Sequence, residues 1–415
     1  MKIALCTIGS RGDIQPFLVL GEYLAQRGHQ VRVCSAQMYA GLAEHYAVEY
    51  VAFAGNYAAI ADDEALKKQI GRNPFTIGKG LKEKVYPILE NSLETFYDQL
   101  LWADVVLYHP KTMIDGIGSN SSHKLIKAYM VPLFSPTRAF ANPILAFLPI
   151  PRFLNRITYK LANALLGAFN RPLKNFKKKR GLPVSKPLLD TPILYGISLS
   201  FLPRPQDYPA NHYYTGFWTP PHQIAPLPKR VQAFMKTAQP KLVITFGSMP
   251  YRSEVDINDF VAAIQRKYEV DILIVRGWGL KNTAITESDT VMAIDHAPFS
   301  SLFPLATAVV HHGGAGTTAI ALEAGLPQMI CPVLHPFGDQ YFWGQQLSNN
   351  GLGPHPVPLA KLSVASLLDG IATLLQEETQ QKAAQLQLAL ATENGLETAS
   401  QLIEAHYKHH RNRMV

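Results

Sequence analysis

A glycine-rich segment in the second half of the chain has residue types that suit binding of a diphosphate. An apolar run over residues 308–310 leads into two histidines and a turn of small residues, His311-His312-Gly313-Gly314-Ala315-Gly316-Thr317. Small residues let a phosphate approach the backbone, and the free amides of residues 314–318 would open a helix N-terminus, which attracts anions. The Thr317 hydroxyl and the His312 ring add hydrogen-bond donors. A structural turn with an incidental histidine is the alternative.

A carboxylate and an amide stand side by side further along, at Asp339 and Gln340, where another helix is expected to begin. Such a pair suits hydrogen bonding to adjacent sugar hydroxyls, because Asp accepts while Gln both accepts and donates.

In the first half, Asp13 lies in the segment Gly9-Ser10-Arg11-Gly12-Asp13-Ile14-Gln15-Pro16, between an expected strand and an expected helix. One interpretation is structural, with Asp13 as the N-cap of a helix that starts before Pro16. The other is catalytic, because a positioned carboxylate can act as a general base that accepts the proton of an attacking group. The two roles are compatible, and Asp13 is our candidate general base.

The sequence has no apparent Asp-X-Asp metal motif, and the adjacent acids Asp62-Asp63-Glu64 are interpreted as the solvated start of a helix. We expect no cofactor and no obligatory metal, with the diphosphate neutralised by backbone dipoles and side-chain donors. The three cysteines lie in separate apolar runs and form neither a disulfide framework nor a zinc pattern. They are interpreted as reduced core residues.

Short apolar strands alternate with helical patterns in both halves, which predicts an α/β fold with two Rossmann-like units and parallel sheets. In the first half, strands are expected over residues 2–7, 31–34, 48–53, 104–108, 131–134 and 193–201. In the second half, they are expected over residues 241–246, 271–275, 291–294, 306–311 and 328–331. Both candidate sites then lie at the carboxyl ends of parallel strands, where ligands bind in such sheets.

The chain of 415 residues is long enough for two domains. A proline-rich stretch over residues 217–228 suits an extended linker. We predict an acceptor-binding domain over residues 1–218, a linker over 219–235, a donor-binding domain over 236–395, and a C-terminal helix with a basic tail over 396–415. That helix is expected to pack back on the first domain.

Composition places the chain among globular proteins, with 47% hydrophobic and 17% charged residues. Without a spanning apolar run or a signal-peptide pattern, we expect a cytoplasmic protein. The formal net charge of +8 fits a phosphate-bearing substrate. The basic run Lys174 to Arg180 lacks the interleaved aromatic residues of a nucleic-acid binder, so no nucleic acid is expected. A solvated helix face and a weak contact with an anionic membrane stay open for this run.

These motifs together resemble the donor-binding signature of glycosyltransferase family 1, in the branch that contains sterol and glycopeptide-antibiotic glucosyltransferases. The resemblance covers nearly the whole chain and implies a GT-B fold, in which two Rossmann-like domains face each other across a cleft. Carried over by position, the donor-binding residues are Ser248, His296, His312, Gly314, Ala315, Gly316, Thr317, Asp339 and Gln340. An aspartate at the position of Asp13 resembles the general base of this branch.

The sequence departs from the pattern of the plant members in two places that concern the donor. Their ribose-binding carboxylate corresponds to Ile320, and their base-stacking tryptophan has no match in the stretch around His296. Either His296 or a neighbouring backbone group contacts the base, or the stretch is structural. Both UDP and dTDP therefore stay open as the donor nucleotide.

The resemblance implies an inverting transferase that moves a hexose, most simply glucose from UDP-glucose, to a hydroxyl of a small lipophilic acceptor such as a sterol, a flavonoid or other phenol, or a polyketide. An epimerase of the same fold and a non-catalytic partner of another transferase are the alternatives. The acceptor pocket is expected in first-half loops that contain Tyr57, Phe75, His109, Phe134, Phe140, Ile144 and Phe147. Helix packing explains these residues equally well, so we assign none of them to the acceptor.

Overall fold

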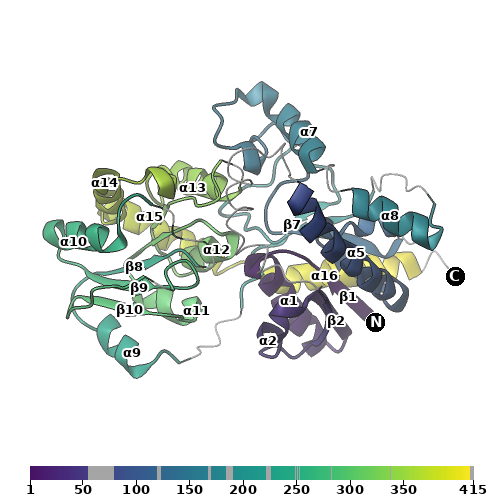
Figure 1. Cartoon of the computed structure of the whole chain (residues 1–415), viewed down its shortest axis with the longest axis horizontal. Coiled ribbons are helices and arrows are strands. Elements are labelled where there is room, and N and C mark those ends of the chain that lie inside the picture. Colours follow the sequence, from purple (N-terminus) through teal and green to yellow (C-terminus); the bar gives the residue numbers. More distant parts are fainter. Residues whose placement is uncertain are drawn as a thin grey trace.

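The computed structural model describes residues 1–411 apart from 55–78, 119–122, 167–169, 184–189, 221–225 and the single positions 248, 250, 252, 282 and 337. The described chain forms two parallel sheets, each covered by helices, which lie side by side (Figure 1). Every described strand pair within the two sheets is parallel, as the alternation of strands and helices predicts.

The first sheet has seven strands in the order β3-β2-β1-β4-β5-β6-β7. Its strands are β1 Lys2–Cys6, β2 Gln30–Ala36, β3 Glu49–Phe53, β4 Val105–Tyr108, β5 Leu125–Tyr129, β6 Ile193–Tyr195 and β7 His212–Tyr214. The helices of this half are α1 Arg11–Gln26, α2 Ala40–Ala43, α5 Lys79–Trp102, α6 Ile114–Ile117, α7 Asn155–Leu166 and α8 Arg171–Arg180. Strands β1 and β4 are neighbours, so the loops that follow them meet at one edge of the sheet.

The second sheet has five strands in the order β10-β9-β8-β11-β12. Its strands are β8 Lys241–Thr245, β9 Asp271–Val275, β10 Val291–Ile294, β11 Ala308–His311 and β12 Gln328–Ile330. The helices that follow the first half in sequence are α9 Lys229–Met235, α10 Ile257–Lys267, α11 Phe299–Leu302, α12 Ala315–Glu323, α13 Gln340–Asn349, α14 Val364–Leu374, α15 Glu377–Leu390 and α16 Gly395–Arg411.

Ten of the eleven expected strands correspond to observed ones, most within one or two residues, but the strand expected over residues 131–134 is wrong. The fifth strand, β5, lies earlier, at Leu125–Tyr129. Its sequence contains Lys127, which interrupts the apolar run from which a buried strand is predicted. The more apolar stretch after it contains Pro132, which has no N–H to donate to a central strand.

The strand expected over residues 193–201 is also too long, and a seventh strand was not expected at all. Strand β6 ends at Tyr195, and Ser198 and Ser200 instead hydrogen-bond to Glu393 from the other half of the chain. Strand β7 is only three residues long and is not apolar throughout, so it carries no clear strand pattern.

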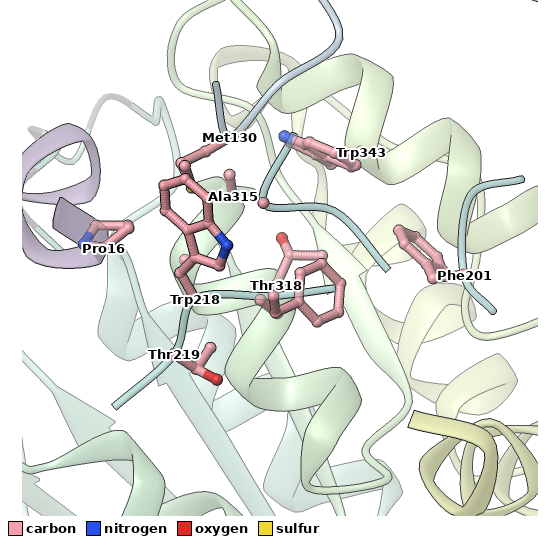
Figure 2. A pocket seen from close by; sticks show the side chains of 12 residues that line it. Pro16, Met130, Phe201, Trp218, Thr219, Ala315, Thr318 and Trp343 are labelled. Atoms are coloured by element: carbon pink, nitrogen blue, oxygen red, sulfur yellow. The ribbon is translucent and has the colours of Figure 1, made fainter. Parts of the chain in front are cut away.

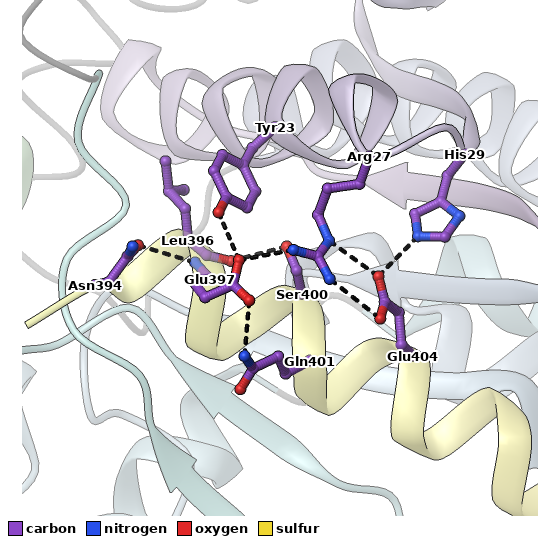
Figure 3. Close-up of polar contacts among 9 residues, drawn as sticks. All are labelled: Tyr23, Arg27, His29, Asn394, Leu396, Glu397, Ser400, Gln401 and Glu404. Atoms are coloured by element: carbon purple, nitrogen blue, oxygen red, sulfur yellow. Dashed lines mark hydrogen bonds and ion pairs between the residues drawn. The ribbon is translucent and has the colours of Figure 1, made fainter.

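The last helix, α16, packs on the first half rather than on the second, where the chain has just been (Figure 1). Leu396, Ala399 and Ile403 enter the core that α1 shares with the first sheet. Figure 3 shows the polar side of this contact, in which Arg27, the C-cap of α1, binds Glu397 at 2.7 Å and Glu404 at 3.0 Å. The first sheet is therefore completed by the C-terminal helix.

The chain passes between the two halves twice, and the two passages touch. A Cβ atom on Gly395 would lie 2.1 Å from the Phe217 carbonyl oxygen, and one on Gly216 would lie 3.0 Å from Gly395 Cα. Gly216 also has φ of +95°, which favours glycine. Two glycines therefore let the backbones cross at a distance that side chains would prevent.

Candidate active site

Asp13 lies in the first turn of α1 at the carboxyl end of β1. Ser10, not Asp13, is the N-cap of this helix, so the expected N-cap assignment is wrong by one turn. Asp13 Oδ2 accepts hydrogen bonds from the Ser10 N–H at 2.8 Å and the Ser10 hydroxyl at 3.0 Å, in a capping arrangement. Gly9 leaves the room for this carboxylate, because a Cβ there would lie 2.2 Å from Asp13 Oδ2.

The second oxygen of Asp13 faces the loop after β4. Lys111 Nζ lies 2.8 Å from Asp13 Oδ1, and His109 Nε2 lies 3.9 Å from it. Burial opposes ionisation of Asp13, but the Lys111 charge and the other donors outweigh it and hold the pKa below its ordinary value. Asp13 is therefore an ionised carboxylate at neutral pH.

His109 is neutral at the same pH. Burial, aided by the Lys111 charge, lowers the pKa of its ring to about 3. Because Nδ1 accepts a hydrogen bond from the Lys111 N–H at 3.1 Å, the ring proton belongs on Nε2, which faces Asp13. The ring packs edge-on against Tyr129 and Phe134.

In the second half, the His312 ring lies between two glycines at the carboxyl ends of β8 and β11. A Cβ on Gly314 would lie 2.6 Å from His312 Nε2, and one on Gly247 would lie 3.0 Å from His312 Cε1. Burial lowers the pKa of His312 to about 3, so the ring is neutral. Its Nδ1 is buried and has no hydrogen-bond partner among the described residues, which is rare for a buried polar atom.

Helix α12 begins directly after this histidine, with Gly314 as its N-cap. The amides of Ala315, Gly316 and Thr317 lie in its first turn, where N–H groups have no partner inside the helix. Gly313, with φ of +88°, lets the chain turn from β11 into α12. The neighbouring His311 has a structural role, since its ring binds Gln328 and accepts the Gly313 N–H.

Asp339 and Gln340 stand at the start of α13 but have different surroundings. Asp339 accepts a hydrogen bond from Trp343 Nε1 at 3.1 Å, and burial raises the pKa of its carboxyl. Gln340 is buried, and its Oε1 accepts the backbone N–H groups of Val333 at 2.7 Å and Leu334 at 2.8 Å. Gln340 thus shapes the loop in front of α13 and keeps only its side-chain NH₂ for a ligand.

Lys111 connects the two candidate sites electrostatically. Its charge acts on Asp13 in its own half and on Asp339 in the other. The halves also meet through aromatic contacts, with Phe140 against Phe342 of α13 and Phe147 against His335 of the loop before it. The candidate base and the candidate sugar-binding carboxylate therefore lie close enough for one charge to act on both across the junction of the halves.

An apolar cavity lies at the junction of α1 and α12. Figure 2 shows Trp218 between Pro16 of α1 and the first turns of α12. Two of the predicted donor-binding residues, Ala315 and Gly316, line this cavity, while Asp13, Lys111 and Asp339 do not. The cavity therefore reaches the start of α12 but not the candidate base.

The loops after β8, β9 and β10 form a continuous edge near His312. The Trp278 N–H binds the Gly247 carbonyl at 2.9 Å, and the Gly277 N–H binds the Asp295 carbonyl at 3.0 Å. The side chains of Trp278 and His296 are both exposed at this edge. The sequence analysis does not include Trp278, although a tryptophan three residues after the apolar run of residues 272–275 is a visible signal.

Some of the expected residues lie outside the described part of the chain, namely Ser248, Tyr57, Phe75 and the acids Asp62-Asp63-Glu64. Over the remaining residues, no group of three His, Cys, Asp or Glu side chains could hold a metal ion. The three cysteines are buried and free, in agreement with the sequence analysis. Among the described helices, none is long and apolar enough to cross a membrane.

Comparison with known proteins gives two family matches, one in each half. Residues 3–103 match the glycosyltransferase family 28 N-terminal domain, and residues 269–404 match the C-terminal domain of the erythromycin biosynthesis protein CIII-like family. The O-mycaminosyltylonolide 6-deoxyallosyltransferase of Streptomyces fradiae is 31% identical over 97% of both chains. The chain belongs to the GT1 superfamily of glycosyltransferases.

Further relatives of this chain are named sterol 3-beta-glucosyltransferases. One from Arabidopsis thaliana is 29% identical over 99% of this chain and 68% of its own length. One from Yarrowia lipolytica is 28% identical over 97% of this chain, which spans 28% of that longer protein.

Solved glycosyltransferase structures confirm the expected GT-B fold. The kitacinnamycin glycosyltransferase superposes with a TM-score of 0.69 at 17% identity, over 98% of this chain and 99% of that one. The glycosyltransferase VinC in complex with dTDP gives 0.63 at 17% identity, over 98% of this chain and all of that one. At such identities the likeness concerns the fold alone.

Proposed function

We propose that this glycosyltransferase is an inverting hexosyltransferase that takes glucose from UDP-glucose, or a hexose from a dTDP-sugar, and transfers it to a hydroxyl of a small lipophilic acceptor. The observation that carries the proposal is that Lys111 forms an ion pair with Asp13 and that its charge also acts on Asp339, so that a candidate base and a candidate sugar-binding carboxylate share one charged neighbour. The relatives named for sterols and for a macrolide support the acceptor class.

In this proposal Asp13 Oδ1 accepts the proton of the acceptor hydroxyl. Oδ2 accepts hydrogen bonds from Ser10, whereas Oδ1 accepts one from Lys111. Oδ1 can therefore release Lys111 and accept a hydrogen bond from the acceptor hydroxyl instead. The oxygen of the acceptor hydroxyl attacks the anomeric carbon from the Asp13 side. The bond from that carbon to the diphosphate breaks on the opposite face, so the configuration inverts. The proton ends on Asp13 and the electron pair on the departing diphosphate.

The departing diphosphate needs compensation for its charge. The amides of the first turn of α12 and the His312 ring are the proposed donors, and Ser248 and Thr317 add hydroxyls. Asp339 and the Gln340 NH₂ would hold the hexose. The nucleobase of the donor would lie along the edge that contains His296, and the Trp278 indole would provide a surface for stacking.

The test is a mass-spectrometric screen with UDP-glucose and dTDP-glucose against pooled sterols, flavonoids and polyketides, run with and without excess EDTA. We expect a glycosylated product with one donor preferred, and activity that survives EDTA. Consumption of the donor without an acceptor product would favour an epimerase. Loss of all activity in EDTA, restored by magnesium or manganese, would contradict the metal-free mechanism.

A further inference from the structure

Helix α7 is fixed to the first half by one side only. On that side, Asn155 Nδ2 donates to the Arg138 carbonyl at 2.9 Å, and the Thr158 hydroxyl accepts the Asn142 N–H at 2.7 Å. Tyr159 is fully buried beneath the helix. The helix is therefore firmly seated, and it projects from the molecule away from both sheets (Figure 1).

The outer side of this helix and of the turn before it carries large apolar side chains. Phe153 is 78% exposed, Ile157 57% and Leu161 48%. Their spacing of four residues puts them in one row along the surface. Single exposed apolar residues are ordinary, but a row of three large ones marks an interaction site.

A basic row runs directly beside the apolar one. Arg152, Arg156 and Lys160 each precede a member of the apolar row by one position and are exposed. Arg156 forms an ion pair with Asp207 at 3.6 Å, while the other two point to solvent. The surrounding sequence, residues 151–180, contains nine Lys or Arg and no Asp or Glu.

We infer that this face of α7, defined by Phe153, Ile157 and Leu161 with Arg152 and Lys160, docks the enzyme on a membrane that carries anionic lipids. The apolar row enters the boundary of the acyl chains, and the basic row meets the lipid phosphates. An apolar stripe beside Lys and Arg is the pattern of helices that lie in the membrane interface. Neutral bilayers lack the attraction for the basic row.

A second copy of the chain fits this face less well. A two-fold contact through the apolar row would bring the basic rows of both copies close together without any acidic residue of this segment to offset them. Charge complementarity therefore favours an anionic surface over self-association.

The docking face leads toward the cleft. The 3₁₀ turn η4, Pro143–Leu145, contacts both α7 and α13. Just after it, Leu148 is exposed while Phe147 packs against His335 of the donor half. If the proposed function holds, docking through this face would bring a bilayer that contains a lipophilic acceptor next to the loop that touches the donor half.

The test measures flotation of the full chain with vesicles of phosphatidylcholine alone or with about 30% phosphatidylserine. We expect binding to the anionic vesicles only, weakened by raising the salt from about 0.1 M to about 0.5 M. The variant Phe153→Gln/Ile157→Gln/Leu161→Gln should lose about tenfold or more of this binding, as should Arg152→Glu/Lys160→Glu. Affinity for UDP, measured by calorimetry, should stay unchanged in both variants.

Two matched controls locate the effect. Leu101→Gln/Leu305→Gln/Leu388→Gln removes three exposed apolar side chains elsewhere, and Lys174→Glu/Lys178→Glu reverses two exposed charges of α8. Both should float like the wild type, and thermal unfolding checks that every variant is folded. Absence of wild-type flotation, or its loss only in the α8 variant, would overturn the inference. So would a dimer in sedimentation that the α7 variant dissociates, which would make this face a contact between copies.

Because flotation needs neither donor nor acceptor, its outcome is independent of the proposed reaction. An enzyme that floats but transfers no sugar would contradict the proposed function alone. An enzyme that transfers sugar but does not float would contradict the docking inference alone.

Discussion

The two oxygens of Asp13 have different partners, and this difference predicts what Asp13→Asn will do. An asparagine can still accept from Ser10, so α1 and the fold should be retained. It cannot take a proton from the acceptor, so turnover should fall by roughly a hundredfold or more. Donor affinity should change little, because the residues that we propose to bind the donor lie in the other half. Steady-state kinetics and UDP titration check both parts, and near-wild-type turnover would remove Asp13 from the mechanism.

Lys111→Met tests the charge beside the base. The ammonium holds the pKa of Asp13 below its ordinary value, so its loss should raise that pKa. Since the base must be ionised, the acidic limb of the pH profile of kcat/KM should move to higher pH. Lys111→Arg keeps the charge and is the control, with a profile like that of the wild type. An unmoved acidic limb in the methionine variant would show that Lys111 does not act on the base.

His312→Ala tests the donor side. The buried Nδ1, which has no partner among the described residues, and the neutral ring between two glycines support the proposal that this histidine binds a phosphate. Its loss should weaken UDP binding by about 1.5–3 kcal/mol, the range for a hydrogen bond to a charged group. Calorimetry with free UDP measures this directly. An unchanged affinity would assign the ring a structural role only.

The sequence predicts those residues that belong to a local motif and misses those that depend on sheet order. Asp13 and His312 stand beside glycines at the ends of apolar runs, so they could be found from spacing. Lys111 lies 98 positions from Asp13, and they meet only because β4 pairs with β1. The available signal is the polar residues His109, Lys111 and Thr112 after an expected strand, but no single sequence says which strands are neighbours.

At the scale of elements, α12 ends at a titrating group on the junction between the halves. Glu323 accepts a hydrogen bond from the Thr219 hydroxyl at 2.7 Å, and burial raises its pKa from 4.5 to about 7. Between these two values the folded state holds a proton that the unfolded state has released. Stability should therefore fall as pH rises through this window.

Glu323→Gln should abolish this pH dependence, because glutamine keeps the acceptor oxygen and cannot ionise. At about pH 8 the variant should be more stable than the wild type by on the order of 2 kcal/mol, and at about pH 5 the two should be alike. Chemical denaturation at both pH values is the measurement. A constant difference at the two pH values would mean that Glu323 does not titrate in this range.

Elements with a continuous apolar run were predictable, and those shaped by distant contacts were not. Strands such as β8 and β9 are buried on both faces, so their sequences read as strands without further context. Strand β6 ends at Tyr195, and Ser198, three residues later, binds Glu393, which is 195 positions away. The local sequence pattern gives no information about such a distant partner.

At the scale of the molecule, the halves should move relative to each other during catalysis. The residues proposed to bind donor and acceptor lie on separate halves, and the chain crosses between the halves at the touching passages of Gly216 and Gly395. We expect binding to close the cleft and exclude water that could hydrolyse the donor. Small-angle scattering with UDP and acceptor should give a smaller radius of gyration than without them. The same radius in all states would argue for a rigid, preformed cleft.

The return of α16 to the first sheet has a consequence for synthesis on the ribosome. The first half is translated early, but three apolar side chains of its core, Leu396, Ala399 and Ile403, are translated only after the whole second half. Until then the matching surface of α1 stays uncovered on the nascent chain. Arg27 likewise lacks its partners Glu397 and Glu404. The first half therefore cannot reach its final stability while the second half is still being translated. Its core is completed only after the second half and α16 have been synthesised.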